Sequence, residues 1–161
     1  MTTPARWIRL DAASEAALRE AATRFARVQT ECAAPAALWG RPDEGGLALA
    51  LVAPQKFAPG HARRWCAWAL SPLVAALRAA GLHAYLEGDG VVSGGRRVAV
   101  SDAIAVGACV VVISSVAAPE GAFLDELRGR IESQHGWQFD HSWPSPAEKE
   151  AMGERANAQQ A

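Results

Sequence analysis

A glycine-punctuated, β-rich stretch over residues 86–115 constrains the fold of this chain more than any other feature. It contains two glycine turns, at 87–90 and 93–95, followed by two runs rich in β-branched residues at 97–101 and 108–115. Asp-Gly and Gly-Gly pairs between such runs favour hairpins, because glycine enters positive φ without steric cost. The stretch therefore predicts a meander of three or four antiparallel strands.

An amphipathic helical pattern precedes this stretch. Its apolar residues recur at three- and four-residue steps, which is the spacing of one helix face. Asp11 or Ser14 can cap its start, because their side-chain oxygens accept unpaired backbone N–H groups. A short strand over residues 7–10 is expected before it, and Pro35 comes after its end. The apolar stripe comprises Leu18, Ala21, Phe25, Val28 and Cys32.

The middle of the chain is expected to alternate between loop, strand and helix. Residues 39–46 are rich in glycine, proline and acidic residues, which is typical of a loop. Residues 47–53 are apolar at both odd and even positions, which predicts a strand in the centre of the sheet. Two helical pieces should follow, at 61–69 and 71–80, the second with its serine as cap and its proline at the first helical position.

The last third of the chain predicts two more helices. One begins at Pro119 and Glu120 and is followed by an aromatic connector over residues 137–143. Residues 145–148 read Ser-Pro-Ala-Glu, a capping box that starts the final helix, and the tail from residue 153 should fray. This order predicts an α+β fold in which a mixed, largely antiparallel sheet has flanking helices.

The composition limits the class of protein. A chain of 161 residues, 50% of them hydrophobic, is long enough for one domain spanning 1–161 with a proper core. Its formal net charge of −1 gives no attraction to nucleic acid or to an anionic membrane. The longest uncharged run, 103–118, is shorter than a membrane-spanning helix requires. We therefore expect a cytoplasmic protein with no nucleic-acid or membrane partner.

Cysteines and histidines suggest no metal centre. Cys32, Cys66 and Cys109 each lie among apolar neighbours, which predicts buried free thiols in a reducing compartment. The histidines show no spacing typical of metal ligands. A nucleophilic pair of Cys109 with a histidine stays open, although a core thiol is the simpler interpretation. The histidines are His61, His83, His135 and His141.

Several other groups have ordinary structural explanations. Ser114 and Ser115 lack the Gly-x-Ser-x-Gly context of a serine hydrolase. Trp65 and Trp68 are three residues apart, as expected for anchors in the core or in an interface. The aromatic residues of segment 137–143 either face a partner or pack the last helix onto the sheet.

Short motifs along the chain resemble the catalytic domain of the biotin and lipoate protein ligases, over residues 35–150. That family carries Asn-Asp, a short apolar strand, a Gly-Arg-Lys motif and a following strand, together with a glycine-rich loop after an arginine. The corresponding residues are Gly88-Asp89, Val91-Val92, Gly95-Arg96-Arg97-Val98-Ala99, the strand Val110–Ile113, and Arg41 with Gly45-Gly46-Leu47.

The resemblance implies a chemistry and a site. These ligases activate a carboxylate as an acyl-adenylate and pass the acyl group to a lysine of a carrier protein. The implied ligands are lipoate, octanoate or biotin with ATP, without a metal site, and Arg97 stands at the catalytic lysine position. The implied ligand-binding residues are Arg41, Gly45, Gly46, Gly88, Asp89, Gly95 and Arg96.

The departures from the motifs argue against ordinary ligase activity. Arg97 replaces the motif lysine and lies one residue further from Asp89 than the family spacing. Arginine keeps the charge but cannot act as a compact ammonium between two oxygens. The chain has only two lysines, Lys56 and Lys149, and neither lies in a motif.

Three hypotheses follow from these departures. The first is an impaired acyl or cofactor transferase. The second is a non-catalytic module that binds a ligand or a protein partner. The third is a resemblance of topology alone. A carrier protein, a partner subunit and a homodimer all stay open as partners.

Overall fold

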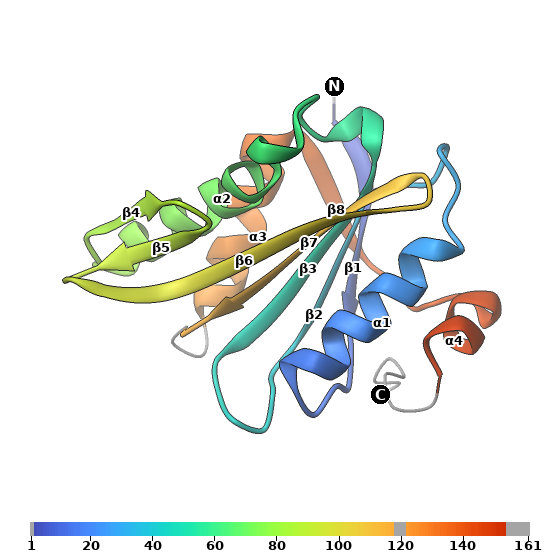
Figure 1. Ribbon diagram of the computed structural model, residues 1–161, viewed down its shortest axis with the longest axis horizontal. Coiled ribbons are helices and arrows are strands. Elements are labelled where there is room, and N and C mark those ends of the chain that lie inside the picture. The colour runs from blue at the N-terminus through green and yellow to red at the C-terminus, as the bar shows by residue number, and fades with distance from the viewer. Residues whose placement is uncertain (1, 118–121, 154–161) are drawn as a thin grey trace.

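A computed structural model describes residues 2–117 and 122–153, and its centre is one mixed sheet (Figure 1). The strands lie in the order β4-β5-β6-β7-β3-β2-β1-β8. β1 pairs in parallel with β2 and β8, and all other neighbouring pairs are antiparallel. The strands are β1 (Thr3–Arg9), β2 (Ala36–Gly40), β3 (Leu47–Pro54), β4 (Ala84–Glu87), β5 (Gly90–Ser93), β6 (Arg96–Val106), β7 (Cys109–Val116) and β8 (Trp137–His141).

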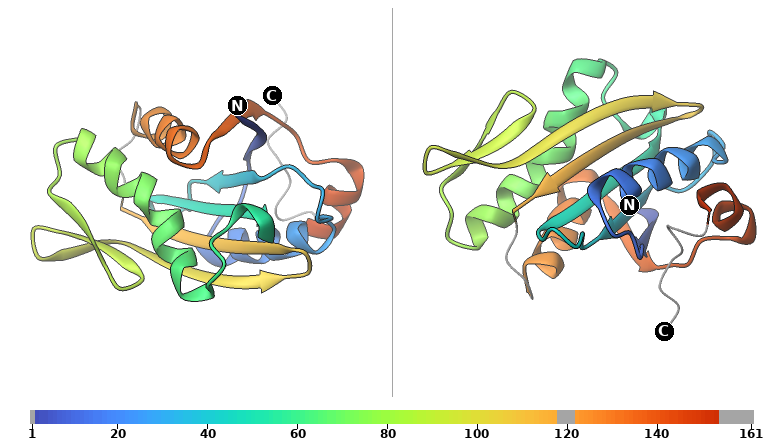
Figure 2. Two further views of the ribbon diagram at one scale, coloured as in Figure 1. Left: turned by 90° about the horizontal axis from the view of Figure 1, so that it is seen from above. Right: turned by 60° about the horizontal axis from the view of Figure 1, so that its bottom comes forward.

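Helices cover both faces of this sheet. α2 and α3 pack on one face, and α1 and α4 pack on the other (Figure 2). The predicted fold class, α+β with a mixed, largely antiparallel sheet and flanking helices, is therefore confirmed. The helices are α1 (Glu15–Arg27), α2 (Trp65–Ala79), α3 (Ala122–His135) and α4 (Pro146–Met152), and two short 3-10 turns lie at Gln55–Phe57 and Ala62–Arg64.

The position of β3 explains its unusual sequence. All eight of its residues are buried, and it pairs with β2 on one side and β7 on the other. Leu49 and Leu51 face α2 and α3, whereas Ala48 and Ala50 face α1. Both faces of the strand are covered, so an apolar residue is favoured at every position. The predicted central strand is confirmed.

The predicted meander is also present, as the four strands β4 to β7. One irregularity lies where β5 meets β6, because Val91 pairs with Ala99 whereas Val92 pairs with Arg97. Val98 is thus left without a partner across the pair, which is the arrangement of a β-bulge. Two predicted helix starts are confirmed, since Ser14 caps α1 and residues 145–148 form the capping box of α4, whereas the predicted start at Ser71 lies inside α2.

Four sequence-based expectations were wrong. The two helical pieces form one helix, α2, which runs through Pro72. Proline cannot donate the usual backbone hydrogen bond, but residues on both sides of it are buried, and this packing keeps the helix continuous. The residues concerned are Leu70, Leu73, Val74 and Leu77.

The other corrections concern the sheet and one cysteine. Trp39 and Gly40 belong to β2 rather than to a loop, and the aromatic connector contains β8, which pairs with β1. α1 ends at Arg27, so Cys32 lies beyond the helix and is exposed, whereas Cys66 and Cys109 are buried as predicted.

Two expectations fall on parts of the chain that the structure leaves undescribed. These are the start of the third helix at Pro119 and Glu120, and the tail over residues 154–161. No helix within residues 2–117 and 122–153 is long and apolar enough to span a membrane.

Candidate functional site

One cavity of about 400 Å³ gathers residues from four separate parts of the chain. It lies where the first turn of α1, the β2–β3 loop, the beginning of β6 and the end of β7 meet, and we call it the β6 cavity. Its volume falls within the range of small-molecule sites. Its lining consists of Glu15, Pro42, Glu44, Gly45, Gly46, Leu47, Arg97, Val98, Ala99, Val100, Ser115, Val116 and Ala117.

The β2–β3 loop reaches the cavity because of its two glycines. Gly45 and Gly46 have φ values of 99° and 77°, which side chains rarely permit. A Cβ atom on Gly46 would lie 2.6 Å from the backbone oxygen of Val116. Glycine at this position therefore allows the loop to approach the end of β7 and close one wall of the cavity.

The cavity carries charges of both signs. Arg97 lines the cavity from β6 and is exposed, and its guanidinium makes no ion pair or side-chain hydrogen bond within the part of the chain that the structure describes. Glu15 forms an ion pair with Arg19 at 3.3 Å, and the carboxylate of Glu44 accepts the Glu15 backbone N–H at 3.4 Å. The guanidinium is therefore the group best placed to bind an anion.

Ser115 adds a polar group to the apolar wall. Its Oγ atom is buried and has no hydrogen-bond partner among the described residues. Buried hydroxyls without a partner are uncommon in folded proteins. A ligand or an ordered water within the cavity is one way to satisfy this hydroxyl.

The structure brings together three of the eight predicted site residues, Gly45, Gly46 and Arg97. The other five do not line the β6 cavity. Arg41 follows β2 and is half-buried. The remaining four are exposed and lie in or beside the two glycine turns, which are at opposite ends of β5: Gly88, Asp89, Gly95 and Arg96.

Asp89 lies near a buried thiol instead of the cavity. Its backbone oxygen accepts the Ser101 N–H at 2.8 Å. Burial raises the pKa of the Cys66 thiol, and the carboxylates of Asp89 and Asp102 raise it further. Cys66 is therefore a protonated core thiol, as its sequence context predicts.

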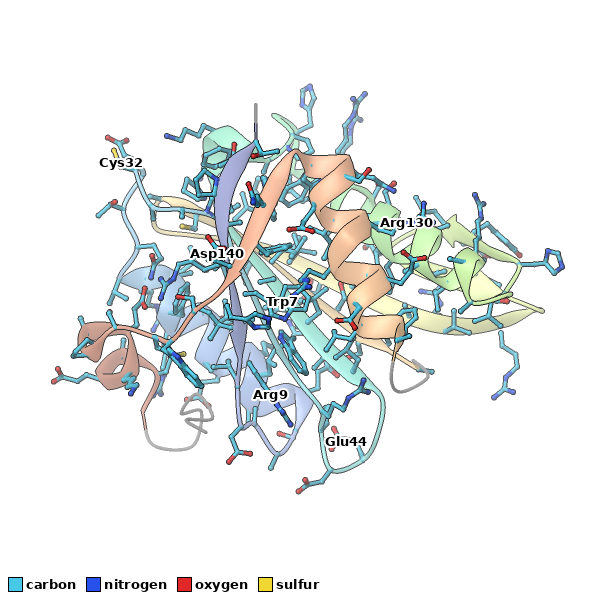
Figure 3. All side chains as sticks on the ribbon, turned by 180° about the vertical axis from the view of Figure 1, so that it is seen from behind. Trp7, Arg9, Cys32, Glu44, Arg130 and Asp140 are labelled. Carbon is cyan, nitrogen blue, oxygen red and sulfur yellow. The ribbon has the colours of Figure 1, made fainter. Side chains whose placement is uncertain are left out.

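Sequence reasoning missed the other three residues with polar side chains in the lining, Glu15, Glu44 and Ser115. Glu44 directly precedes the glycine pair, and Ser115 interrupts a valine-rich strand, but neither pattern alone indicates a site. Figure 3 shows Glu44 on the β2–β3 loop and Cys32 on a loop at the opposite end of the molecule. The exposed cysteine is therefore remote from the cavity.

Comparisons with known proteins agree with this fold. No family model matches the chain, and no curated protein matches it in sequence. Solved structures do match. A bipartite lipoate protein ligase from Thermoplasma acidophilum, studied with its E2 lipoyl domain, gives a TM-score of 0.74 at 11% identity, covering 93% of this chain and 91% of that chain.

Two further ligase structures extend the match. A lipoate-protein ligase A bound with ATP gives a TM-score of 0.74 at 8% identity, covering 94% of this chain and 93% of that chain. The biotin protein ligase from Aquifex aeolicus gives 0.58 at 12% identity, covering 83% of this chain and 69% of that chain. The chain therefore has the fold of the lipoate and biotin protein ligase catalytic domain, which confirms the resemblance at the level of fold.

Proposed function

We propose that this protein is a lipoate/biotin protein ligase-like domain whose β6 cavity binds an acyl or cofactor carboxylate and its adenylate, with impaired transfer to a carrier-protein lysine. One observation carries the proposal. Arg97 and the glycine pair of the β2–β3 loop are about fifty residues apart in sequence, yet they line the same cavity. A ligase-like reaction needs a cation together with a backbone segment that can approach the ligand closely.

The cation explains why binding is retained. Formation of an acyl-adenylate brings a carboxylate against the α-phosphate of ATP, so two anions must lie close together. A guanidinium neutralises such anions and can donate two parallel hydrogen bonds to one carboxylate or phosphate. Arg97 carries this charge on a wall of the cavity, with no competing ion pair in the described chain.

The same cation explains why transfer is impaired. A planar guanidinium is wider than an ammonium and cannot point three donors between the two reacting oxygens. No lysine is among the residues that line the cavity within the described chain. Lys56 lies on the 3-10 turn after β3, and Lys149 lies on α4. Neither lysine replaces the missing ammonium.

The ligand and partner classes follow from the related folds. We propose lipoate, octanoate or biotin, with ATP, as candidate ligands, since the similar structures are lipoate and biotin ligases and one is bound with ATP. A carrier domain is the candidate acceptor, by analogy with the E2 lipoyl domain of the bipartite ligase. A partner subunit is also compatible with that analogy.

The second candidate function is a non-catalytic module that uses the same cavity to bind a ligand. The absence of lysine from the described cavity lining favours it. The two candidates share the ligand class and differ in the transfer step. Measurement of binding and transfer on the same protein therefore separates them.

Thermal melting with lipoate, biotin, octanoate, ATP and a nonhydrolysable acyl-adenylate tests the binding step. A ligand at about 100 times its Kd stabilises a protein by about 2.7 kcal/mol, which raises the Tm of a chain of this size by roughly 5–10 °C. We expect the acyl-adenylate to raise the Tm. We expect Arg97→Ala to abolish the shift, and Arg96→Ala, an exposed neighbour outside the cavity, to preserve it.

Acyl transfer to a purified lipoyl domain tests the second step. We expect slow transfer or none with the natural chain, and faster transfer with Arg97→Lys, because lysine restores the compact ammonium. Binding without transfer in both proteins would favour the non-catalytic module. A Tm that no ligand changes would refute the proposed function.

A further inference from the structure

Gly90, the first residue of β5, is a glycine that its backbone conformation does not require. It is not among the residues with positive φ, and it pairs with Val100 within the meander. Gly90 closes the turn between β4 and β5, and glycine inside a strand also often marks a close approach by another group. The reason for glycine at this position lies in the space above its α-carbon.

Arg97 occupies that space. A Cβ atom on Gly90 would lie 2.8 Å from Nη1 and 3.3 Å from Cζ of Arg97, and 2.7 Å from the backbone oxygen of Ala99. The contacts with Nη1 and with the Ala99 oxygen are shorter than real Cβ atoms show, so the guanidinium and the strand pair would both have to shift. The guanidinium of Arg97 therefore rests directly against the bare α-carbon of Gly90.

The strand register explains how the arginine reaches this point. Arg97 pairs with Val92, and Gly90 lies two residues before Val92, on the same face of β5. The bulge that leaves Val98 unpaired aligns the faces in this way. The long side chain of Arg97 can thus cross β5 diagonally to Gly90 while its residue still lines the β6 cavity.

We infer that Gly90 is a positioning residue that makes room for the Arg97 guanidinium and so holds it for a carboxylate or phosphate ligand in the β6 cavity. The inference rests on the proposed function and adds a residue to its site. Arg97 is exposed and no side chain of the described chain pairs with its guanidinium, so the contact with Gly90 sets how closely the guanidinium lies over β5. A methyl group at residue 90 would displace the cation.

A double-mutant cycle tests this role. Calorimetry would measure the affinity of the natural chain, Gly90→Ala, Arg97→Lys and the double variant for the nonhydrolysable acyl-adenylate. Lysine ends at Nζ, which corresponds to Cζ of arginine, and has no counterpart of Nη1, the arginine atom that a Cβ on Gly90 would meet at 2.8 Å. The contact with the Ala99 oxygen is the same in both backgrounds, so its effect on the strand pair cancels.

We expect Gly90→Ala to weaken binding by at least about tenfold when residue 97 is arginine, and by less than about twofold when it is lysine, as for residues in direct contact. An equal loss in both backgrounds would overturn the positioning role. Absence of binding by the natural chain itself would overturn the proposed function and this inference together. The two failures are therefore distinguishable.

A second measurement covers the case in which Gly90→Ala does not fold. The backbone amide resonance of Gly90 in the natural chain should shift when the acyl-adenylate is added, because the guanidinium above it changes its partner. Arg97→Lys should remove most of that shift. A Gly90 resonance that the ligand leaves unchanged, while other cavity residues respond, would overturn the inference.

Discussion

Replacement of Glu148 by glutamine should destabilise the fold in a pH-dependent way. The Glu148 side chain is 8% exposed and lies at the centre of a hydrogen-bond network. Both Nη atoms of Arg6 donate to its oxygens at 2.8 Å, Gln29 donates at 2.6 Å and the Ser145 N–H donates at 2.8 Å. The network connects α4 to β1 and to the segment after α1.

The size of the expected destabilisation follows from the pKa of the Glu148 carboxyl. Burial alone would raise the pKa of Glu148, but hydrogen bonds from Arg6, the Ser145 backbone and Gln29 outweigh burial and lower it from 4.5 to about 2. At about 1.4 kcal/mol per pH unit, the ionised carboxylate contributes about 3 kcal/mol. Because the folded pKa is the lower one, this contribution is complete above pH 4.5 and is lost as the pH falls toward 2.

Urea unfolding at pH 7 and at pH 3 measures the effect. Glu148→Gln should lower the free energy of unfolding by about 3 kcal/mol at pH 7 and by about half as much at pH 3. Glu150→Gln, an exposed residue of the same helix, is the matched control and should change it by less than about 0.5 kcal/mol. Equal effects of the two substitutions, or a Glu148 effect that is the same at both pH values, would refute the reasoning.

Two further predictions concern His135 and the cysteines. Burial lowers the pKa of His135, which stacks on Trp68 at 4.6 Å, to about 4. The stability due to neutral His135 is complete above pH 6.5 and is lost as the pH falls toward 4. His135→Phe should therefore flatten the dependence of Tm on pH across this interval, and an unchanged dependence would contradict the assignment. In the folded protein the exposed Cys32 should react with a thiol reagent. Cys66 and Cys109 should react only after unfolding, because burial raises the pKa of both thiols. Equal reaction rates of the three cysteines would contradict the described burial.

Local patterns predicted the parts of the fold that local chemistry controls. Glycine turns separate the strands of the meander, and a turn acts over two to four residues. The Ser145 capping box likewise involves neighbours in sequence. The central position of β3 was readable because a strand covered on both faces is apolar throughout. Recognition of the ligase-like fold depended on these same short motifs.

The tertiary structure decided what depends on distant partners. β8 joins β1 across more than a hundred residues, and no local pattern specifies that parallel pairing. Packing against the sheet overrode the helix-breaking tendency of Pro72. The aromatic segment 137–143 has the alternating side chains of a strand, but it contains a strand only because it pairs with β1.

The candidate site also has a part that the sequence predicted and a part that only the tertiary structure decided. Sequence reasoning named Gly45, Gly46 and Arg97, and their catalytic and binding roles stay predictions. The sequence determined which side chains could bind an anion, because charge and glycine content are properties of single residues. Only the folded chain decided that Arg97 lies against Gly90 and lines a cavity with Glu15. These contacts exist because strand register and helix packing bring together segments that are separate in the sequence.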